Sequence, residues 1–327
     1  VNNNGIGVSG IAGGDAAAGK KGVKIMSCVI FDGDHMGNEA QALVWAADNG
    51  AVIAQNSWGY LSGNNLKDTP EYTKKAIDYF VKYAGCDEDG NQLPDSPMKG
   101  GVAIFASGND GLPVGYPASY EKCVAVSSVA GDYEMAYYSN FGDWVDIMAP
   151  GGDTKKSQMI LSTVPNNSYD RMQGTSMACP HVSGVAALVV SHFKGQGFTN
   201  TTLRDKLIRG ANTKVLSKNA KIGALVDAFG AMTYGGTTPP AKVQSATPSV
   251  KSNNVKLTWK VTSDPDDKKA FGYIVIVSAD QDQLKTLNPA SLPEGTFAVL
   301  AMVEDRKVGE EMSGTVTGLE FSKDYYA

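Results

Sequence analysis

The chain has 327 residues, of which 42% are hydrophobic and 19% are charged. This length predicts one large domain with a smaller one, and the composition excludes a disordered or fibrous protein. A net charge of −5 argues against nucleic acid or an anionic membrane surface as the main partner, and no apolar run approaches the roughly 20 residues of a bilayer span.

The chain begins with VNNNGIG, without a methionine or a signal-like apolar stretch, so we expect that a preceding segment has been removed. The four cysteines lie far apart and form no CxxC pair, so zinc or thioredoxin-like chemistry is not expected. They are Cys28, Cys86, Cys123 and Cys179. Spacing leaves disulfides and buried free thiols equally open.

Short apolar runs alternate with segments of helical periodicity in the first two thirds of the chain. The runs are continuous rather than alternating, which is typical of buried parallel strands. They cover residues 23–30, 51–57, 101–107 and 123–129. Helices are predicted over 38–50 and 69–85, the second with Thr69 as its N-cap and Pro70 in its first turn. This order predicts a parallel sheet with helices on both faces.

The pattern changes after YGGTTPPAK, where Gly and Pro predict a linker over 236–241. The β-rich segments that follow predict an all-β sandwich. We therefore expect domains over 1–235 and 242–327. The segments KLTW, FGYIVIV and VTGLEFSKDYYA resemble a fibronectin type III module, which implies further strands beyond Ala327. An adhesive or glycan-binding role of this module has little support, because exposed-type aromatic residues are few.

The sequence RMQGTSMACPHVSG opens an apolar helix with a Gly-Thr-Ser triplet. Gly174 permits a tight turn, which places Ser176 in the first helical turn, where unpaired N–H groups and the helix dipole favour negative charge. Pro180 has no N–H to donate back into that turn. Because Ser and Thr are also preferred helix caps, the residues alone leave a nucleophile and a simple cap both open.

GTSMACPHVSG resembles the serine signature of subtilisin-like serine proteases, the subtilases. Further matching stretches follow in family order over residues 1–233: VNNNGIGVSGIAGG, NSWG, FASGND, DIMAPGG and ILSTVP. The resemblance implies an α/β fold, a subtilisin-like three-layer parallel sheet whose first part is missing, with the β-sandwich attached. It also implies a secreted, periplasmic or cell-surface serine endopeptidase acting on polypeptides.

By the same resemblance Ser176 is the nucleophile, and Asn109 is a side-chain oxyanion donor beside the Ser176 backbone N–H. From the residues alone, Asn109 also fits an ordinary Asn-Asp-Gly turn. The resemblance further implies two strands that pair with an extended peptide. Their residues are Ser57, Trp58 and Gly59, and Ala106, Ser107 and Gly108.

Gly115 falls where the family has the floor of its specificity pocket, so we expect a large apolar or aromatic side chain before the scissile bond. A simple turn role for Gly115 stays open.

The family order is Asp, His, Ser, yet the chain contains no Asp-Thr-Gly, Asp-Ser-Gly or His-Gly-Thr. Its three histidines are poor substitutes: His181 lies on another face of the serine helix, His192 lies near the end of that helix, and His35 lies in a loop. We expect that Asp and His belong to a missing N-terminal segment and that the chain alone is inactive. Unpaired sheet edges then predict a companion segment or self-association. The alternative is a non-catalytic subtilase relative that binds peptides.

VNNNGIGV resembles a calcium loop of the family, with oxygens from the Asn4 side chain and the carbonyls of Asn2, Ile6 and Val8. The family completes that site with an Asp from the missing region, so Ca²⁺ occupancy stays open, and no cofactor is required. The stretch over 86–100 contains DEDGN without the closing Glu of an EF-hand. It is expected to form a solvated insertion beside the substrate cleft.

Overall fold

The computed structural model describes residues 2–327 except 34, 62–65, 216–220, 267–268, 288–291 and 304–305. These residues form two compact units, Val1–Tyr234 and Gly235–Ala327. Independent folding of the predicted domains, 1–235 and 242–327, stays a prediction.

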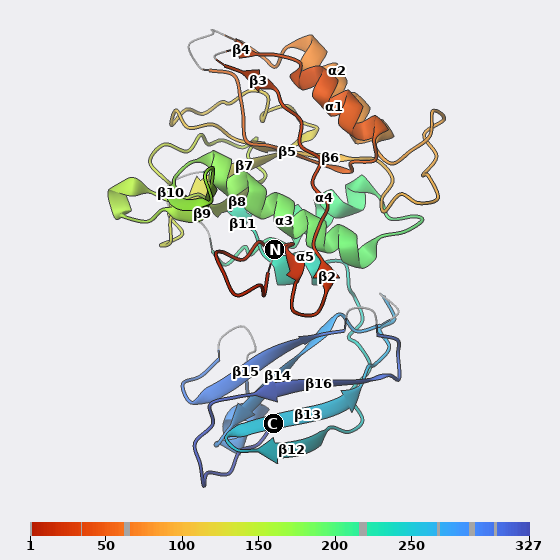
Figure 1. Cartoon of the computed structure of the whole chain (residues 1–327), viewed down its shortest axis with the longest axis vertical. Coiled ribbons are helices and arrows are strands. Elements are labelled where there is room, and N and C mark those ends of the chain that lie inside the picture. Colours follow the sequence, from red (N-terminus) through yellow and green to blue (C-terminus); the bar gives the residue numbers. More distant parts are fainter. Residues whose placement is uncertain are drawn as a thin grey trace. The chain divides into compact units, whose positions relative to one another are not determined.

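The core of the first unit is a five-stranded parallel sheet in the order β11-β8-β7-β6-β5 (Figure 1). Its strands are β5 (Ile53–Asn56), β6 (Val102–Ala106), β7 (Cys123–Val129), β8 (Ile147–Pro150) and β11 (Ala224–Leu225). Every residue of β6 and β7 is buried, as the continuous apolar runs predict. The predicted strands over 51–57, 101–107 and 123–129 are confirmed.

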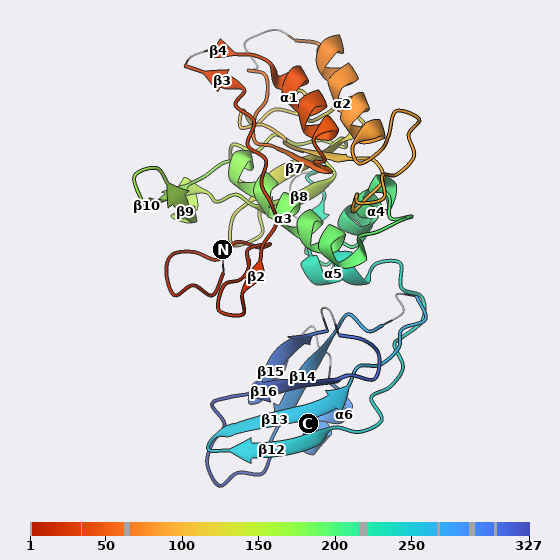
Figure 2. The same cartoon turned by 45° about the vertical axis from the view of Figure 1, so that its right-hand side comes forward.

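Helices cover both faces of this sheet, as predicted (Figures 1 and 2). On one face, α1 (Glu39–Asp48) and α2 (Glu71–Tyr83) pack in one apolar cluster with Ala103 and Phe105 of β6. Successive strand residues point to opposite faces, so Ile104 faces the other way. That face is covered by α3 (Thr175–Phe193), which contacts β5, β6, β7 and β8.

Other elements complete the first unit. They are β1 (Gly14–Asp15), β2 (Lys20–Lys21), β3 (Phe31–Asp32), β4 (His35–Met36), η2 (Thr154–Lys156), β9 (Ile160–Val164), β10 (Ser168–Met172), α4 (Asn200–Arg209) and α5 (Ala228–Thr233). Within the described part of the chain, α3 is the one helix with the length and hydropathy to cross a membrane. It is packed against four strands of the sheet, as expected of a core helix.

The predicted N-cap of the second helix is wrong. Pro70 occupies the N-cap of α2 with φ −54° and ψ 141°, and no side chain caps the helix. The Thr69 hydroxyl is buried and has no hydrogen-bond partner among the described residues. Because the extended Pro70 separates Thr69 from the first helical turn, the hydroxyl does not bond to that turn.

The predicted buried strand over 23–30 is also wrong. No strand is present there, and the side chains of Val23, Ile25 and Val29 are 55%, 87% and 83% exposed. The apolar composition is that of a buried strand, but no described strand lies beside the segment to pair with it. β5 is correspondingly an edge strand, only partly buried.

The second unit is built of β-strands, as predicted, with one short helix, α6, among its described residues. One antiparallel sheet has the order β12-β13-β16, and β14 pairs with β15. The bounds are β12 (Thr247–Lys251), β13 (Asn254–Lys260), β14 (Gly272–Ser278), α6 (Gln281–Lys285), β15 (Thr296–Met302) and β16 (Glu311–Val316). Side chains from both sheets share one core, which includes Trp259, Val275, Val277 and Met312.

Candidate active site

Ser176 is the second residue of α3, and it is not a cap. Gly174 holds the N-cap position with φ 150°, a backbone conformation that favours glycine, so the N-cap residue itself has no side chain to cap the helix. Because Ser176 lies in the first turn of the helix, its N–H has no intrahelical carbonyl acceptor. Its Oγ is 3.4 Å from the carbonyl oxygen of Ser57, to which it donates.

Pro180 and Ser57 together shape the opposite side of this turn. Pro180 lies inside α3 and cannot donate the helical hydrogen bond to the carbonyl of Ser176. The Oγ of Ser57 donates to that carbonyl instead, at 2.7 Å, and the Gln55 amide donates to the same Oγ at 2.6 Å. The end of β5 is therefore fastened to the start of α3.

The amide of Asn109 faces the same helix start. Its Oδ1 accepts hydrogen bonds from the N–H and the hydroxyl of Thr175, both at 2.9 Å. The Thr175 hydroxyl in turn accepts from the N–H of Gly108 at 3.2 Å. Because Oδ1 of Asn109 faces Thr175, its Nδ2 donor points away from Thr175. Nδ2 lies 3.7 Å from the place that a Cβ would take if Gly174 carried one. Asn109 is exposed and does not serve only its own turn.

The two predicted substrate strands lie at the carboxyl ends of β5 and β6. Ser57 follows β5 directly and contacts Ser176, while Ser107 follows β6. Trp58 is anchored by its Nε1, which donates to the Asn56 side chain at 3.0 Å. Parallel strands bring these ends to one edge of the sheet, which is why residues so far apart in sequence meet. The structure thus brings Ser57, Gly108 and Asn109 together at the start of α3, next to Ser176, and Gly59 lines one pocket with Ala106, Ser107 and Gly108. The Trp58 side chain packs against Phe105 instead.

A pocket of about 110 Å³ opens between these two segments. Its lining is mainly apolar and includes Leu66, Leu112, Val114, Gly115 and Tyr116. A Cβ on Gly115 would come within 2.0 Å of the Ser107 carbonyl oxygen, so a larger residue has no room there.

Asn140 supports this pocket and is missed by the sequence reading. It is 2% exposed, and its Oδ1 accepts from the N–H groups of Asp110 and Leu112, both at 3.0 Å. Its Nδ2 donates to the carbonyls of Ser107 and Val114. The local sequence YYSNFG carries no signal of this role, because all four partners come from another stretch of chain.

No histidine of the described residues contacts the Ser176 hydroxyl. His181 Nδ1 lies 2.8 Å from the carbonyl of Met177, one turn back on α3. His192 lies in the last turn of α3 against Phe193. The side chain of His35 falls outside the described residues.

Cys179 is close to Ser176 in sequence but is not a second nucleophile. Its thiol is completely buried and donates to the carbonyls of Asn56 and Ile104 at 3.7 and 3.5 Å. Burial raises the pKa of this thiol to about 11, so it stays protonated near neutral pH. All four cysteines are free thiols.

The predicted calcium loop contains only neutral oxygens at the four expected positions. The Asn2 carbonyl already accepts from the N–H of Ala16 at 2.9 Å, and Asn4 Oδ1 accepts from Ile6 at 3.4 Å. The Asn2 side-chain oxygen is buried and has no partner in the part of the chain that the structure describes. Within the described chain, no group of three His, Cys, Asp or Glu residues is arranged to hold a metal. The loop does not fit a complete Ca²⁺ site by itself.

The insertion over 86–100 does not lie beside the substrate cleft. Gln92 donates to the carbonyl of Gly195 at 2.9 Å, just beyond the last turn of α3. Since α3 has 19 residues, about 28 Å separates this loop from Ser176 at 1.5 Å per residue. The expected position is wrong because the loop follows α2, whose C-terminal end is far from the carboxyl edge of the sheet.

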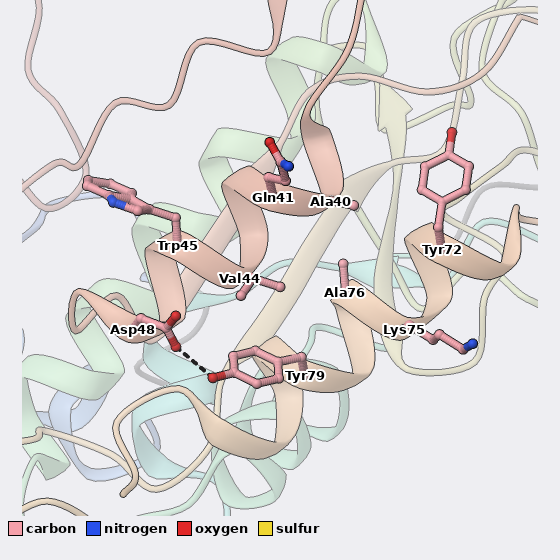
Figure 3. A pocket seen from close by; sticks show the side chains of 9 residues that line it. All are labelled: Ala40, Gln41, Val44, Trp45, Asp48, Tyr72, Lys75, Ala76 and Tyr79. Carbon is pink, nitrogen blue, oxygen red and sulfur yellow. Dashed lines mark hydrogen bonds between the residues drawn. The ribbon is translucent and has the colours of Figure 1, made fainter. Parts of the chain in front are cut away.

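A second, open pocket lies between α1 and α2 and shares no lining residue with the first (Figure 3). Tyr79 of α2 donates to Asp48 of α1 at 2.7 Å across it, and Trp45 and Tyr72 expose more than half of their surface beside it.

Comparison with known proteins identifies similar chains. A profile of the Subtilase family, Peptidase_S8, matches residues 1–232. Thermophilic serine proteinase of Bacillus sp. (strain AK1) is 34% identical over 222 residues, which cover 65% of this chain and 47% of that protein. Alkaline elastase YaB of Bacillus sp. (strain YaB) is 35% identical over 206 residues, which cover 63% and 45%. The chain thus spans about half the length of these two relatives.

Subtilisin BL of Lederbergia lenta is 32% identical over 228 residues, which cover 69% of this chain and 71% of that protein. Among solved structures, the prenylagaramide maturation protease PagA matches with a TM-score of 0.49 and 26% identity, covering 62% of this chain and 70% of that one.

Proposed function

Because this chain belongs to the subtilase family, we propose that it provides the nucleophile and the oxyanion donors of a serine endopeptidase. The observation that carries the proposal is the contact of Asn109 with Thr175, next to Ser176. This contact leaves the Nδ2 group of Asn109 and the backbone N–H of Ser176 as donors near the half-buried hydroxyl of Ser176, at the N-terminus of α3. Such donors stabilise the negative charge that develops on a peptide carbonyl during attack.

The reaction follows from these groups once a base is present. Ser176 Oγ attacks the carbonyl carbon of the scissile bond and its proton passes to an imidazole, while the oxyanion accepts bonds from Asn109 Nδ2 and the Ser176 N–H. The tetrahedral intermediate collapses, the C–N bond breaks, and the imidazolium protonates the leaving amine. Water then attacks the acyl-enzyme, which releases the acid and restores the hydroxyl.

The imidazole and its Asp are proposed to come from a segment outside residues 1–327, so the chain alone is inactive. The hydroxyl of Ser176 finds a carbonyl acceptor on Ser57 and no described imidazole. Loss of the histidine base removes nearly all triad catalysis, on the order of a million-fold in subtilisin itself.

The companion segment is proposed to be a β-strand that pairs with β5. The outer edge of β5 has no described partner, and residues 23–30, which form no strand, expose the apolar side chains of Val23, Ile25 and Val29. A parallel strand beside β5 would end near Ser57 and Ser176, because carboxyl ends of parallel strands share one edge. Without it, self-association through the same edge is the expected alternative.

The substrate is proposed to be a polypeptide bound along Ser57–Gly59 and Ala106–Gly108, with a large apolar or aromatic residue before the scissile bond. The largely apolar lining of the pocket and the small residue at Gly115 support this choice.

Ca²⁺ binding at Asn2–Val8 is proposed to require a carboxylate from the companion segment. Secretion and a fibronectin type III-like identity of the second unit remain proposals from the resemblance.

A fluorophosphonate probe tests the proposal, because it labels an activated serine. The wild-type chain and Ser176→Ala are incubated with the probe, alone and with the N-terminal segment of Subtilisin BL that precedes the matched region. We expect labelling only for the wild-type chain with the segment, together with a rise in melting temperature. A segment that raises the melting temperature without Ser176-dependent labelling would contradict the catalytic proposal.

A non-catalytic peptide binder is the second candidate, because no described histidine contacts Ser176. It predicts that the segment never produces labelling, while peptides still bind the groove.

A further inference from the structure

The buried carboxylate of Glu39 has no role in the chemistry above. Glu39 is the first residue of α1, and the residue is only 5% exposed. Its polar partner among the described residues is the hydroxyl of Tyr60, which donates to Oε1 at 2.9 Å. No described Lys or Arg forms an ion pair with it. Lys74, which follows Thr73 on α2, bonds to Asp68 instead. A buried acidic side chain without a cationic partner is costly unless other groups hydrogen-bond to it.

Tyr60 connects this carboxylate to the substrate groove. Its hydroxyl lies 2.7 Å from Thr73 Oγ1 and 3.3 Å from the hydroxyl of Tyr72, and the residue also lines the pocket beside Gly108 and Gly115. Burial, with the neighbouring Glu39, raises the pKa of Tyr60, so its phenol stays protonated.

The cluster of Glu39, Tyr60 and Tyr72 adjoins the proposed substrate segment, because Tyr60 follows Gly59 directly. Ser57 contacts Ser176, and Tyr60 is three residues further along, about 10 Å at the rise of an extended chain. A peptide that pairs with Ser57–Gly59 therefore passes this cluster several residues before the scissile bond. The one charged residue that lines the pocket itself, Asp110, is also acidic.

We propose that Glu39 is the anionic end of a subsite for a basic side chain of the peptide, upstream of the residue held in the pocket. The inference rests on the proposed peptide binding. Two tyrosine rings, one of them 55% exposed at Tyr72, provide faces for an ammonium or guanidinium group. The carboxylate behind them provides the opposite charge in a partly dehydrated site. Figure 3 shows Tyr72 and Lys75 leaving α2 in different directions.

Fluorescent peptides with Phe before the scissile bond test this inference by anisotropy on the intact chain. Lys, norleucine or acetyl-lysine is placed in turn at each of the upstream positions. We expect one position at which Lys binds roughly tenfold more tightly than either neutral analogue, as a charge-assisted contact would give. Glu39→Gln should bring the three affinities within about twofold, whereas Glu71→Gln, at the exposed first residue of α2, should not.

The outcomes separate the two proposals. If no peptide binds, the proposed function and the subsite both fail. If peptides bind with equal affinity for Lys, norleucine and acetyl-lysine, the subsite alone fails. The peptide comparison uses the wild-type chain, so it decides the question even where Glu39→Gln does not fold.

Discussion

The hydroxyl of Ser57 donates a 2.7 Å hydrogen bond to the backbone carbonyl of Ser176, the carbonyl that Pro180 leaves without a helical donor. A residue of the proposed substrate segment is thereby bonded to the residue proposed as nucleophile. The missing N–H of a proline inside a helix normally costs stability, and here the side chain of Ser57, the residue after β5, offsets that loss.

Ser57→Ala is expected to lower the free energy of unfolding by about 1–2 kcal/mol, because it removes both the hydrogen bond to the Ser176 carbonyl and the one from the Gln55 amide. In a Pro180→Ala background the cost should be smaller, because a backbone N–H returns to the helix. Urea denaturation of the two single variants and the double variant gives the coupling energy. Strictly additive effects would show that the two residues do not share the carbonyl.

Asn109→Ala is expected to slow fluorophosphonate labelling of the complemented protein about 100-fold, the lower end of the loss when this donor is removed from subtilisin itself. Asn91→Ala, in a loop where Asn91 bonds only to the neighbouring Asp87, is the control. The measured quantity is the second-order labelling rate. An unchanged rate for Asn109→Ala in a folded protein would exclude it as an oxyanion donor.

Gly115→Ala is expected to destabilise the fold by about 1–3 kcal/mol and to weaken binding of peptides with Phe before the scissile bond. The reason is the 2.0 Å approach of a Cβ to the Ser107 carbonyl oxygen. Gly37→Ala, with no atom within 4 Å of the new Cβ, should change neither property. Thermal melts and peptide anisotropy provide the two readouts.

Iodoacetamide at pH 8 is expected to modify Cys28 and Cys86 and to spare Cys123 and Cys179 in the native chain. The first two are partly exposed, while burial raises the pKa of each of the other two thiols. Mass spectrometry of the peptides, with a urea-unfolded sample as control, reads out each site. Resistance of Cys28 and Cys86 in both samples would indicate a disulfide in place of free thiols.

Ile25→Lys with Val29→Lys is expected to raise the solubility of the isolated chain without lowering its melting temperature, because both side chains are more than four-fifths exposed. The same double variant should no longer be stabilised by the N-terminal segment of Subtilisin BL, since charges would enter the proposed strand interface. Lys20→Glu with Lys21→Glu in the exposed β2 is the control. Unchanged stabilisation of the double variant would place the segment elsewhere.

The sequence by itself determined the elements whose signals are local. Continuous apolar runs predicted β6 and β7, and the Gly-Thr-Ser start of an apolar helix placed Ser176 at the N-terminus of α3. These features follow from side-chain pattern and backbone preference, which a short window contains.

The tertiary structure decided what depends on distant partners. Residues 23–30 have the composition of a buried strand, yet a strand needs a neighbour for its backbone groups, and none is described. Three other features likewise could not be predicted from the sequence. They are the orientation of the Asn109 amide, the hydrogen bonds by which Asn140 supports the pocket, and the burial of Glu39. In each case the partner lies in a remote stretch of chain that only the packed sheet brings into reach.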